Sequence, residues 1–175
     1  IKPANFDATK SYPTLVYVYN GPGVQLINNT SLASASLWMH YLANEYNYIV
    51  FTVDGRGSEN RGRDFEQAMF RNLGEVEMKD QITGVEHLKS LGFVDENRIA
   101  VHGWSYGGFM TTNLLCTYPN VFTCGVAGGP VIDWKFYEIM YTERFMDTPQ
   151  TNPEGYESAS LLNKAKDLQD NYTRW

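Results

Sequence analysis

Gly-Trp-Ser-Tyr-Gly-Gly at residues 103–108 is the stretch of sequence that decides the fold. It follows the apolar run Ile99–Val101 and precedes the helix-like run Phe109–Leu115, so it predicts a strand, a very tight turn and a helix. Gly-x-Ser-x-Gly in this setting is the nucleophile-elbow pattern, because only glycines fit beside a serine on so sharp a turn. Ser105 would be exposed at a helix N-terminus, where backbone N–H groups face a developing negative charge. The alternative is a glycine-rich turn with an idle serine.

The length, composition and net charge of the sequence limit the classes of protein to which it can belong. The 175 residues are enough for one domain with a substantial core, and the 43% apolar content predicts a globular chain. Fourteen Lys plus Arg against twenty Asp plus Glu give a net charge of −6 without long runs, which argues against a nucleic-acid partner. No apolar run approaches the length needed to span a bilayer. Two cysteines are too few for a disulfide framework.

Strand-like and helix-like patterns alternate along the chain. They predict strands at residues 14–19, 48–53, 99–101 and 121–127, and helices at residues 37–46, 75–91 and 109–115. Leu37, Tyr41 and Leu42 have helical spacing in the first of these helices. In the second helix, Glu77 lies with other acidic residues near the N-terminal end, where the helix dipole favours them.

This alternation predicts the fold class. Continuous apolar strands separated by helices indicate a mostly parallel α/β sheet flanked by helices, and the elbow makes it an α/β-hydrolase fold. Beyond Val131 there is an aromatic-rich segment at 134–146 and a polar, helical segment at 158–169, but no strand-like run. We therefore expect the sheet to be incomplete at its C-terminal side.

A serine nucleophile needs a base and an acid, which in this fold follow the serine in the order Asp or Glu, then His. The three histidines, His40, His87 and His102, all precede Ser105. The acidic candidates after the serine are Asp147, Asp167 and Asp170, and no strand precedes any of them. The triad is thus incomplete in the sequence: either the chain is the first part of a catalytic domain, or the protein is not a hydrolase.

Four motifs together resemble the dipeptidyl peptidase IV family, a branch of the prolyl oligopeptidase family of serine peptidases. They are the elbow, Asp-Gly-Arg-Gly-Ser at 54–58, Val-Tyr-Asn-Gly-Pro-Gly at 18–23 and Tyr-Thr-Glu-Arg-Phe-Met at 141–146, in the family's order. The resemblance runs from about residue 12 to about residue 166 and is more specific than the elbow alone.

The resemblance implies roles for particular residues. Ser105 matches the nucleophile, and the Tyr19 hydroxyl with the backbone N–H of Tyr106 matches the oxyanion hole. The pocket for the residue before the scissile bond, usually proline and sometimes alanine, matches Tyr106, Val131, Trp134, Tyr137 and Tyr141. A proline ring is apolar and has no N–H, so aromatic walls suit it. Judged by composition alone, these aromatic residues would be ordinary core.

The resemblance also implies what the full protein does. It would release N-terminal dipeptides with Pro or Ala at the second position through an acyl-enzyme on Ser105, with no metal or organic cofactor. The family's later Asp and His and its N-terminal β-propeller are not in the sequence, so we take residues 1–175 as the nucleophile-bearing part of a catalytic domain, inactive alone. A homodimer and a periplasmic, secreted or membrane-anchored location are further expectations.

Two alternatives stay open. One is another activity of the same family, that of an acylaminoacyl peptidase or prolyl endopeptidase. The other is a non-catalytic interaction module that keeps the fold.

Overall fold

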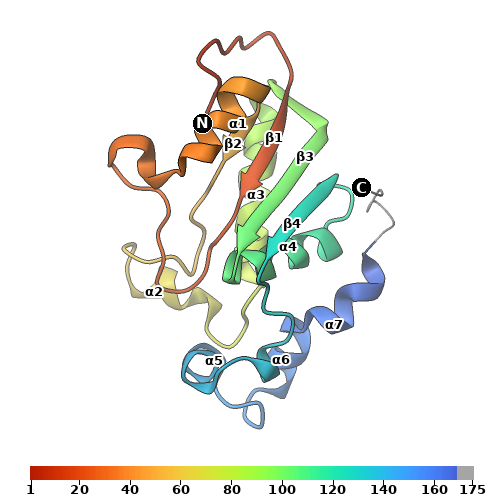
Figure 1. Cartoon of the computed structure of the whole chain (residues 1–175). Coiled ribbons are helices and arrows are strands. Elements are labelled where there is room, and N and C mark those ends of the chain that lie inside the picture. Colours follow the sequence, from red (N-terminus) through yellow and green to blue (C-terminus); the bar gives the residue numbers. More distant parts are fainter. Residues whose placement is uncertain (169–175) are drawn as a thin grey trace.

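The computed structural model describes residues 1–168, apart from the side chains of residues 33 and 34. Four parallel strands form one sheet in the order β2-β1-β3-β4 (Figure 1). The strands are β1 (Tyr12–Tyr17), β2 (Ile49–Phe51), β3 (Val94–Trp104) and β4 (Cys124–Gly128). Helices lie on both faces of this sheet, so the predicted parallel α/β architecture is confirmed.

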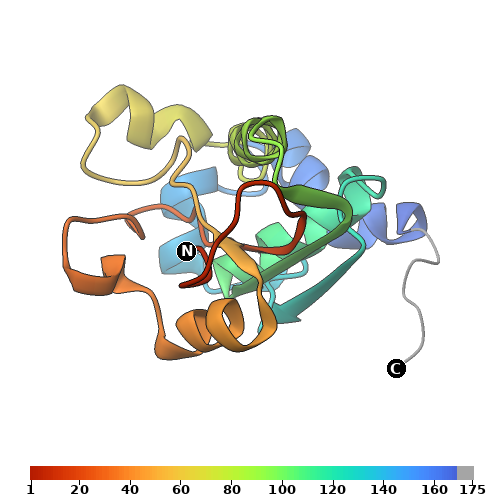
Figure 2. The same ribbon diagram turned by 90° about the horizontal axis from the view of Figure 1, so that it is seen from above.

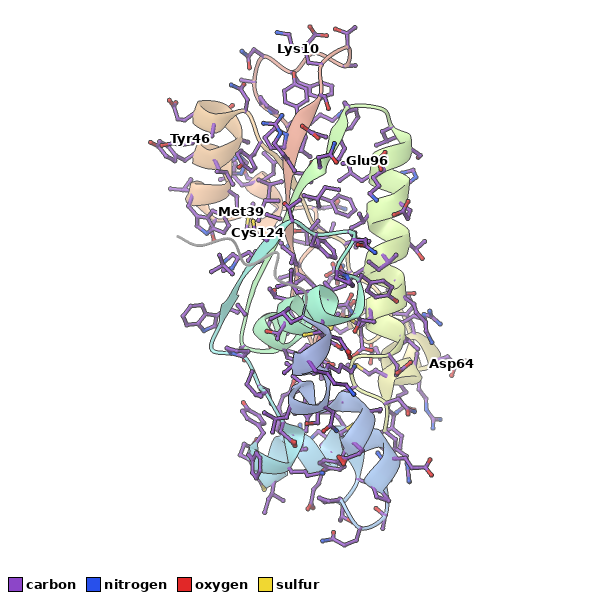
Figure 3. The ribbon with its side chains drawn as sticks, turned by 90° about the vertical axis from the view of Figure 1, so that its right-hand side faces the viewer. Lys10, Met39, Tyr46, Asp64, Glu96 and Cys124 are labelled. Carbon is purple, nitrogen blue, oxygen red and sulfur yellow. The ribbon has the colours of Figure 1, made fainter. Side chains whose placement is uncertain are left out.

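The helices form layers around the sheet. They are α1 (Leu37–Tyr46), α2 (Arg63–Glu66), α3 (Val76–Ser90), α4 (Tyr106–Thr117), α5 (Ile139–Met146), α6 (Pro153–Ala159) and α7 (Leu161–Lys164). Seen from above, the sheet lies between α1 and α3 (Figure 2), and the side-chain view shows the same separation (Figure 3). The short helices α5, α6 and α7 gather at the end of the sheet where the strands terminate (Figure 1).

Side-chain alternation in β1 explains the two layers. Val16 and Val18 point into the large core that contains residues of α3 and α4, whereas Leu15 packs with Met39 of α1 in a smaller cluster. Successive side chains of a strand point to opposite faces, so one apolar run supplies both clusters. A continuous apolar strand is therefore what this position requires.

Helix α4 is the centre of the core. Phe109, Met110 and Leu114 are completely buried, and so are polar residues such as Asn113. The sheet covers one side of α4 and the C-terminal helices cover another, where Lys164 of α7 donates to the Asn113 side chain at 2.8 Å. A helix covered on several sides has no wide polar face, which is why its sequence is apolar nearly throughout.

The bounds of all four strands differ from the predicted ranges, and at the starts of β3 and β4 the structure shows the reason. β3 begins at Val94 because Phe93 and Val94 are buried and the Phe93 carbonyl accepts the Tyr12 N–H at 2.9 Å. β4 begins only at Cys124, because the Val121 N–H closes a turn onto the Tyr118 carbonyl. Strand pairing then starts beside the Thr123 N–H, which donates to the Ile99 carbonyl at 2.8 Å.

The predicted polar helix at 158–169 is divided. Ser160 is extended between α6 and α7, where its hydroxyl donates to the Asp133 carboxylate at 2.7 Å. The Leu161 N–H donates to the Ile132 carbonyl at 2.9 Å, so the chain is tied to the segment after β4 instead of continuing one helix. Residue 169 lies outside the described residues. Within the described range, no helix is long and apolar enough to cross a membrane.

We predict that Leu114→Ala lowers the free energy of unfolding by about 3 kcal/mol, since it opens a cavity in a completely buried site. The matched control is Leu37→Ala in α1, where the side chain is 75% exposed and the change should stay within about 0.5 kcal/mol. Urea unfolding of both variants measures the difference. Equal losses would contradict the placement of α4 at the centre of the core.

Candidate active site

Ser105 occupies a strained turn between β3 and α4. Its φ is 59° and its ψ is −114°, a backbone conformation that non-glycine residues rarely adopt and that costs roughly 1–3 kcal/mol. The Ser105 N–H donates to the Gly128 carbonyl at 2.8 Å, which fixes the turn to the end of β4. The side chain is partly exposed, and its hydroxyl has no hydrogen-bond partner among the described residues. The turn therefore presents a free hydroxyl.

Gly103 and Gly107 make this turn possible. A Cβ on Gly103 would collide with the carbonyl oxygens of Val18 and Gly107, and a Cβ on Gly107 would collide with the Val18 carbonyl. The backbone of Val18, just after β1, thus lies directly against both glycines of the elbow. Any larger residue at these two positions would push the elbow away from β1.

Tyr19 follows β1 and lies beside the elbow. Its ring centroid is 6.1 Å from that of Tyr106, and a Cβ on Gly21 would come within 2.8 Å of both rings. Burial raises the pKa of Tyr19, so its phenol stays protonated and can donate a hydrogen bond. Tyr106 is the first residue of α4, so its N–H has no partner within the helix. The hydroxyl and this N–H are donors of the kind that can stabilise an oxyanion.

Asn20 holds the Tyr19 loop in place, a role that sequence reasoning missed. Its φ is 53°, in the left-handed region that asparagine tolerates. Its side-chain NH₂ donates to the Arg56 carbonyl at 2.9 Å, and its oxygen accepts from the Gly55 N–H at 2.9 Å and from Gln81 at 2.7 Å. The Arg56 guanidinium in turn pairs with Asp80 at 2.7 Å. The 54–58 motif thus connects the Tyr19 loop to α3.

Four of the five residues predicted to form the pocket make ring contacts with one another. The Trp134 centroid lies 5.5 Å from Tyr106, 5.7 Å from Tyr137 and 6.0 Å from Tyr141, on which it stacks. Trp134 is only 1% exposed, Tyr137 is 40% exposed and Tyr141 is intermediate. Val131, the fifth, is buried in the same core cluster. Burial raises the pKa of Tyr141, so its phenol stays protonated and uncharged.

Glu77 is buried behind the elbow and contacts Tyr106. The sequence indicated only that Glu77 lies near a helix N-terminus, where the helix dipole favours an acidic residue. Glu77 is 0% exposed and accepts the Tyr106 hydroxyl at 2.6 Å and the Gly74 N–H at 3.0 Å. Burial raises the pKa of Glu77 to about 7, and burial together with the Glu77 charge raises the pKa of Tyr106. No feature of the α3 sequence distinguishes Glu77 from its exposed neighbour Glu75.

None of the three histidines makes a hydrogen bond to Ser105 in the described part of the chain. His40 lies on α1, and His87 is exposed on α3. His102 points to the α1 side of the sheet, where its Nδ1 is 2.7 Å from the Val126 carbonyl and its ring contacts Tyr17 and Trp38.

The acidic residues considered for the triad make other contacts or lie elsewhere in the structure. Asp147 pairs with Arg71 at 2.6 Å, and Asp167 lies in a short 3-10 turn. Asp170 is outside the described residues. Over residues 1–168 no cluster of His, Cys, Asp and Glu has the arrangement of a metal site.

Comparison with known proteins identifies the family. The sequence profile described as "Prolyl oligopeptidase family" matches residues 33–175. The crystal structure of a putative dipeptidyl aminopeptidase IV from Bacteroides ovatus superposes with a TM-score of 0.93 at 58% identity, over 96% of this chain and 24% of that one.

Two further relatives agree with this. Porphyromonas gingivalis dipeptidyl peptidase 4 superposes with a TM-score of 0.90 at 41% identity, over 97% of this chain and 24% of that one. A probable dipeptidyl-aminopeptidase B from Arthroderma gypseum is 47% identical over 163 residues, which are 93% of this chain and 17% of the relative. The chain thus spans about a fifth of the length of these relatives.

We predict that Gly107→Ala destabilises the protein by about 3 kcal/mol, because the new methyl group would collide with the Val18 carbonyl. Gly92→Ala, just after α3, is the control: its φ is 80° but no atom lies within 4 Å of the new Cβ, so only backbone strain of about 1 kcal/mol is expected. Urea unfolding measures both. If Gly107→Ala lowers the free energy of unfolding no more than the control does, the close approach of the Val18 carbonyl to the elbow is contradicted.

Glu77 also predicts a pH dependence of stability. Its pKa of about 7 in the folded chain lies above the ordinary value of 4.5, so the folded state retains a proton that the unfolded state releases. The free energy of unfolding therefore falls as the pH rises from 4.5 to 7, by about 3 kcal/mol from this group.

Glu77→Gln should remove that contribution, so the fall in stability between pH 4.5 and pH 8 should be about 3 kcal/mol smaller than in the wild type. Urea unfolding at the two pH values measures it. The same fall in both proteins would show that Glu77 titrates normally.

Proposed function

The chain belongs to the prolyl oligopeptidase family, and on that premise we propose that it carries the nucleophile of a serine peptidase of the dipeptidyl peptidase type. The observation that supports this most directly is the elbow: a partly exposed Ser105 with positive φ, held between close-packed glycines. In this arrangement the hydroxyl is available to a substrate and lies at the N-terminus of α4.

The chemistry follows from the groups around Ser105. Its Oγ attacks the carbonyl carbon of the scissile bond, and its proton passes to a general base that then protonates the leaving amine. The Tyr19 hydroxyl and the Tyr106 N–H stabilise the oxyanion. The C–N bond breaks, an ester forms on Ser105, and water hydrolyses that ester. We place the base and its acid outside residues 1–175, because no histidine follows Ser105 in the sequence.

The aromatic surface of Tyr106, Trp134, Tyr137 and Tyr141 supports a preference for proline or alanine before the scissile bond. An uncharged aromatic wall can bury a small apolar side chain, and the missing N–H of proline leaves no donor unpaired there. We also place a β-propeller and a homodimer interface in the full-length protein, as the family resemblance implies.

The rival activity in the same family differs in the substrate's amino terminus. A dipeptidyl peptidase requires a free amino terminus, whereas an acylaminoacyl peptidase or prolyl endopeptidase accepts a blocked one. The second rival is an interaction module without activity. It is disfavoured because Ser105 and Tyr19 are both present, and the Tyr19 ring lies 6.1 Å from that of Tyr106, the residue after Ser105.

The test uses the full-length protein with Gly-Pro-p-nitroanilide and its N-blocked counterpart. We expect hydrolysis of the free substrate only, and a loss of about 10⁴-fold or more in Ser105→Ala. The isolated chain 1–175 should show no turnover. Comparable rates on the blocked substrate would favour the rival activity, and undiminished turnover in Ser105→Ala would refute the nucleophile.

A further inference from the structure

Glu77 is a buried carboxyl group that the proposed chemistry does not use. It lies in the first turn of α3, completely covered, with one oxygen bound to the Tyr106 hydroxyl and to the Gly74 N–H. Its second oxygen is buried and has no hydrogen-bond partner in the described residues. A carboxyl group in such a place costs stability, and an apolar side chain of similar size would fill the space without that cost.

Tyr106 connects Glu77 to the site. The backbone of Tyr106 follows Ser105 directly, and its ring is 1% exposed. That ring touches the rings of three neighbours, with centroid distances of 6.1 Å to Tyr19, 5.4 Å to Phe109 and 5.5 Å to Trp134. Within residues 1–168, the Tyr106 hydroxyl makes one hydrogen bond, to Glu77. The ring is therefore fixed at one end by the elbow and at the other end by Glu77.

The turn at Gly74, which leads into α3 and to Glu77, is held by close packing. Gly74 has a φ of 82°, and a Cβ there would lie 2.7 Å from both Phe109 and Asn113. The Asn113 side chain donates to the Gly74 carbonyl at 3.3 Å. The turn that leads into α3 is thus packed against α4 on the side that carries Tyr106. Movement of Glu77 relative to the elbow would disturb these contacts.

We propose that Glu77 is a positioning residue for substrate selection: by holding the Tyr106 hydroxyl, it sets the position of the ring against Trp134 and Tyr19. It thereby fixes the depth of the pocket for the residue before the scissile bond. This inference rests on the proposed function and adds to it a residue that never touches the substrate. A buried acid that lowers stability while ordering a site is a trade-off common in functional sites.

The experiment measures kcat and KM of the full-length protein on Gly-Pro and Gly-Ala p-nitroanilides, per active serine titrated with a fluorophosphonate. The variants are Glu77→Leu, which removes the acceptor, Glu77→Gln, whose amide oxygen still accepts, Tyr106→Phe, and Glu77→Leu combined with Tyr106→Phe. Glu75→Leu is the control, since Glu75 lies two residues away, is exposed and forms an ion pair with Lys79 on the surface.

In Glu77→Leu we expect KM for the proline substrate to rise about 10-fold and the preference for proline over alanine to fall by a similar factor. Tyr106→Phe should match it, because it breaks the same hydrogen bond, and the combined variant should be no worse than either. Glu77→Gln should keep the wild-type preference to within about 3-fold. Glu75→Leu should not change it.

A purely structural role for Glu77 predicts something else: a lower melting temperature or fewer titratable serines, with KM and the proline preference per active serine unchanged. That result would overturn the inference while leaving the proposed function intact. If Glu77→Leu does not fold, Tyr106→Phe decides the question, and an unchanged preference there overturns the inference. A wild-type protein without turnover would refute the proposed function and this inference with it.

Discussion

The structure depends on the contact between the backbone of Val18, just after β1, and the two glycines of the elbow. The Val18 carbonyl occupies the space that a Cβ on Gly103 or Gly107 would need. Because of this contact, the chain turns from β3 into α4 within one residue, and the strain falls on Ser105, whose φ is 59°. The Ser105 N–H is bonded to β4, so the strands on both sides of β3 fix the turn.

The same constraint arranges the groups around the serine. Tyr19 follows Val18 in the chain, so the segment that packs against the elbow also brings the Tyr19 ring to within 6.1 Å of the Tyr106 ring. Tyr106 follows Ser105, so the turn places its N–H at the helix start and its ring against Trp134. Glu77 of α3 then holds the Tyr106 ring through its hydroxyl, which requires the burial of a carboxyl group. Local chain geometry and one long-range hydrogen bond thus build the aromatic surface together.

The sequence predicts what is local and misses what depends on packing between distant segments. Glycine spacing around Ser105 specifies the elbow, because only glycines fit beside so sharp a turn. Unbroken apolar runs specify the parallel sheet, because its strands are covered on both faces. Helical spacing predicted α1, but the face marked by Leu37 and Tyr41 is exposed, and Met39 is buried instead. The burial of Glu77 could not be predicted either, because it depends on where α4 places Tyr106. The catalytic and pocket roles remain predictions.

The central claim is that the glycine-packed elbow makes Ser105 the reactive serine of the protein. Treatment of the full-length protein with a fluorophosphonate, followed by peptide mass spectrometry, tests it most directly. The account predicts one stoichiometric adduct, located on Ser105 and absent after prior unfolding in urea. An adduct on a different serine, or no adduct on a protein that is folded, would contradict it.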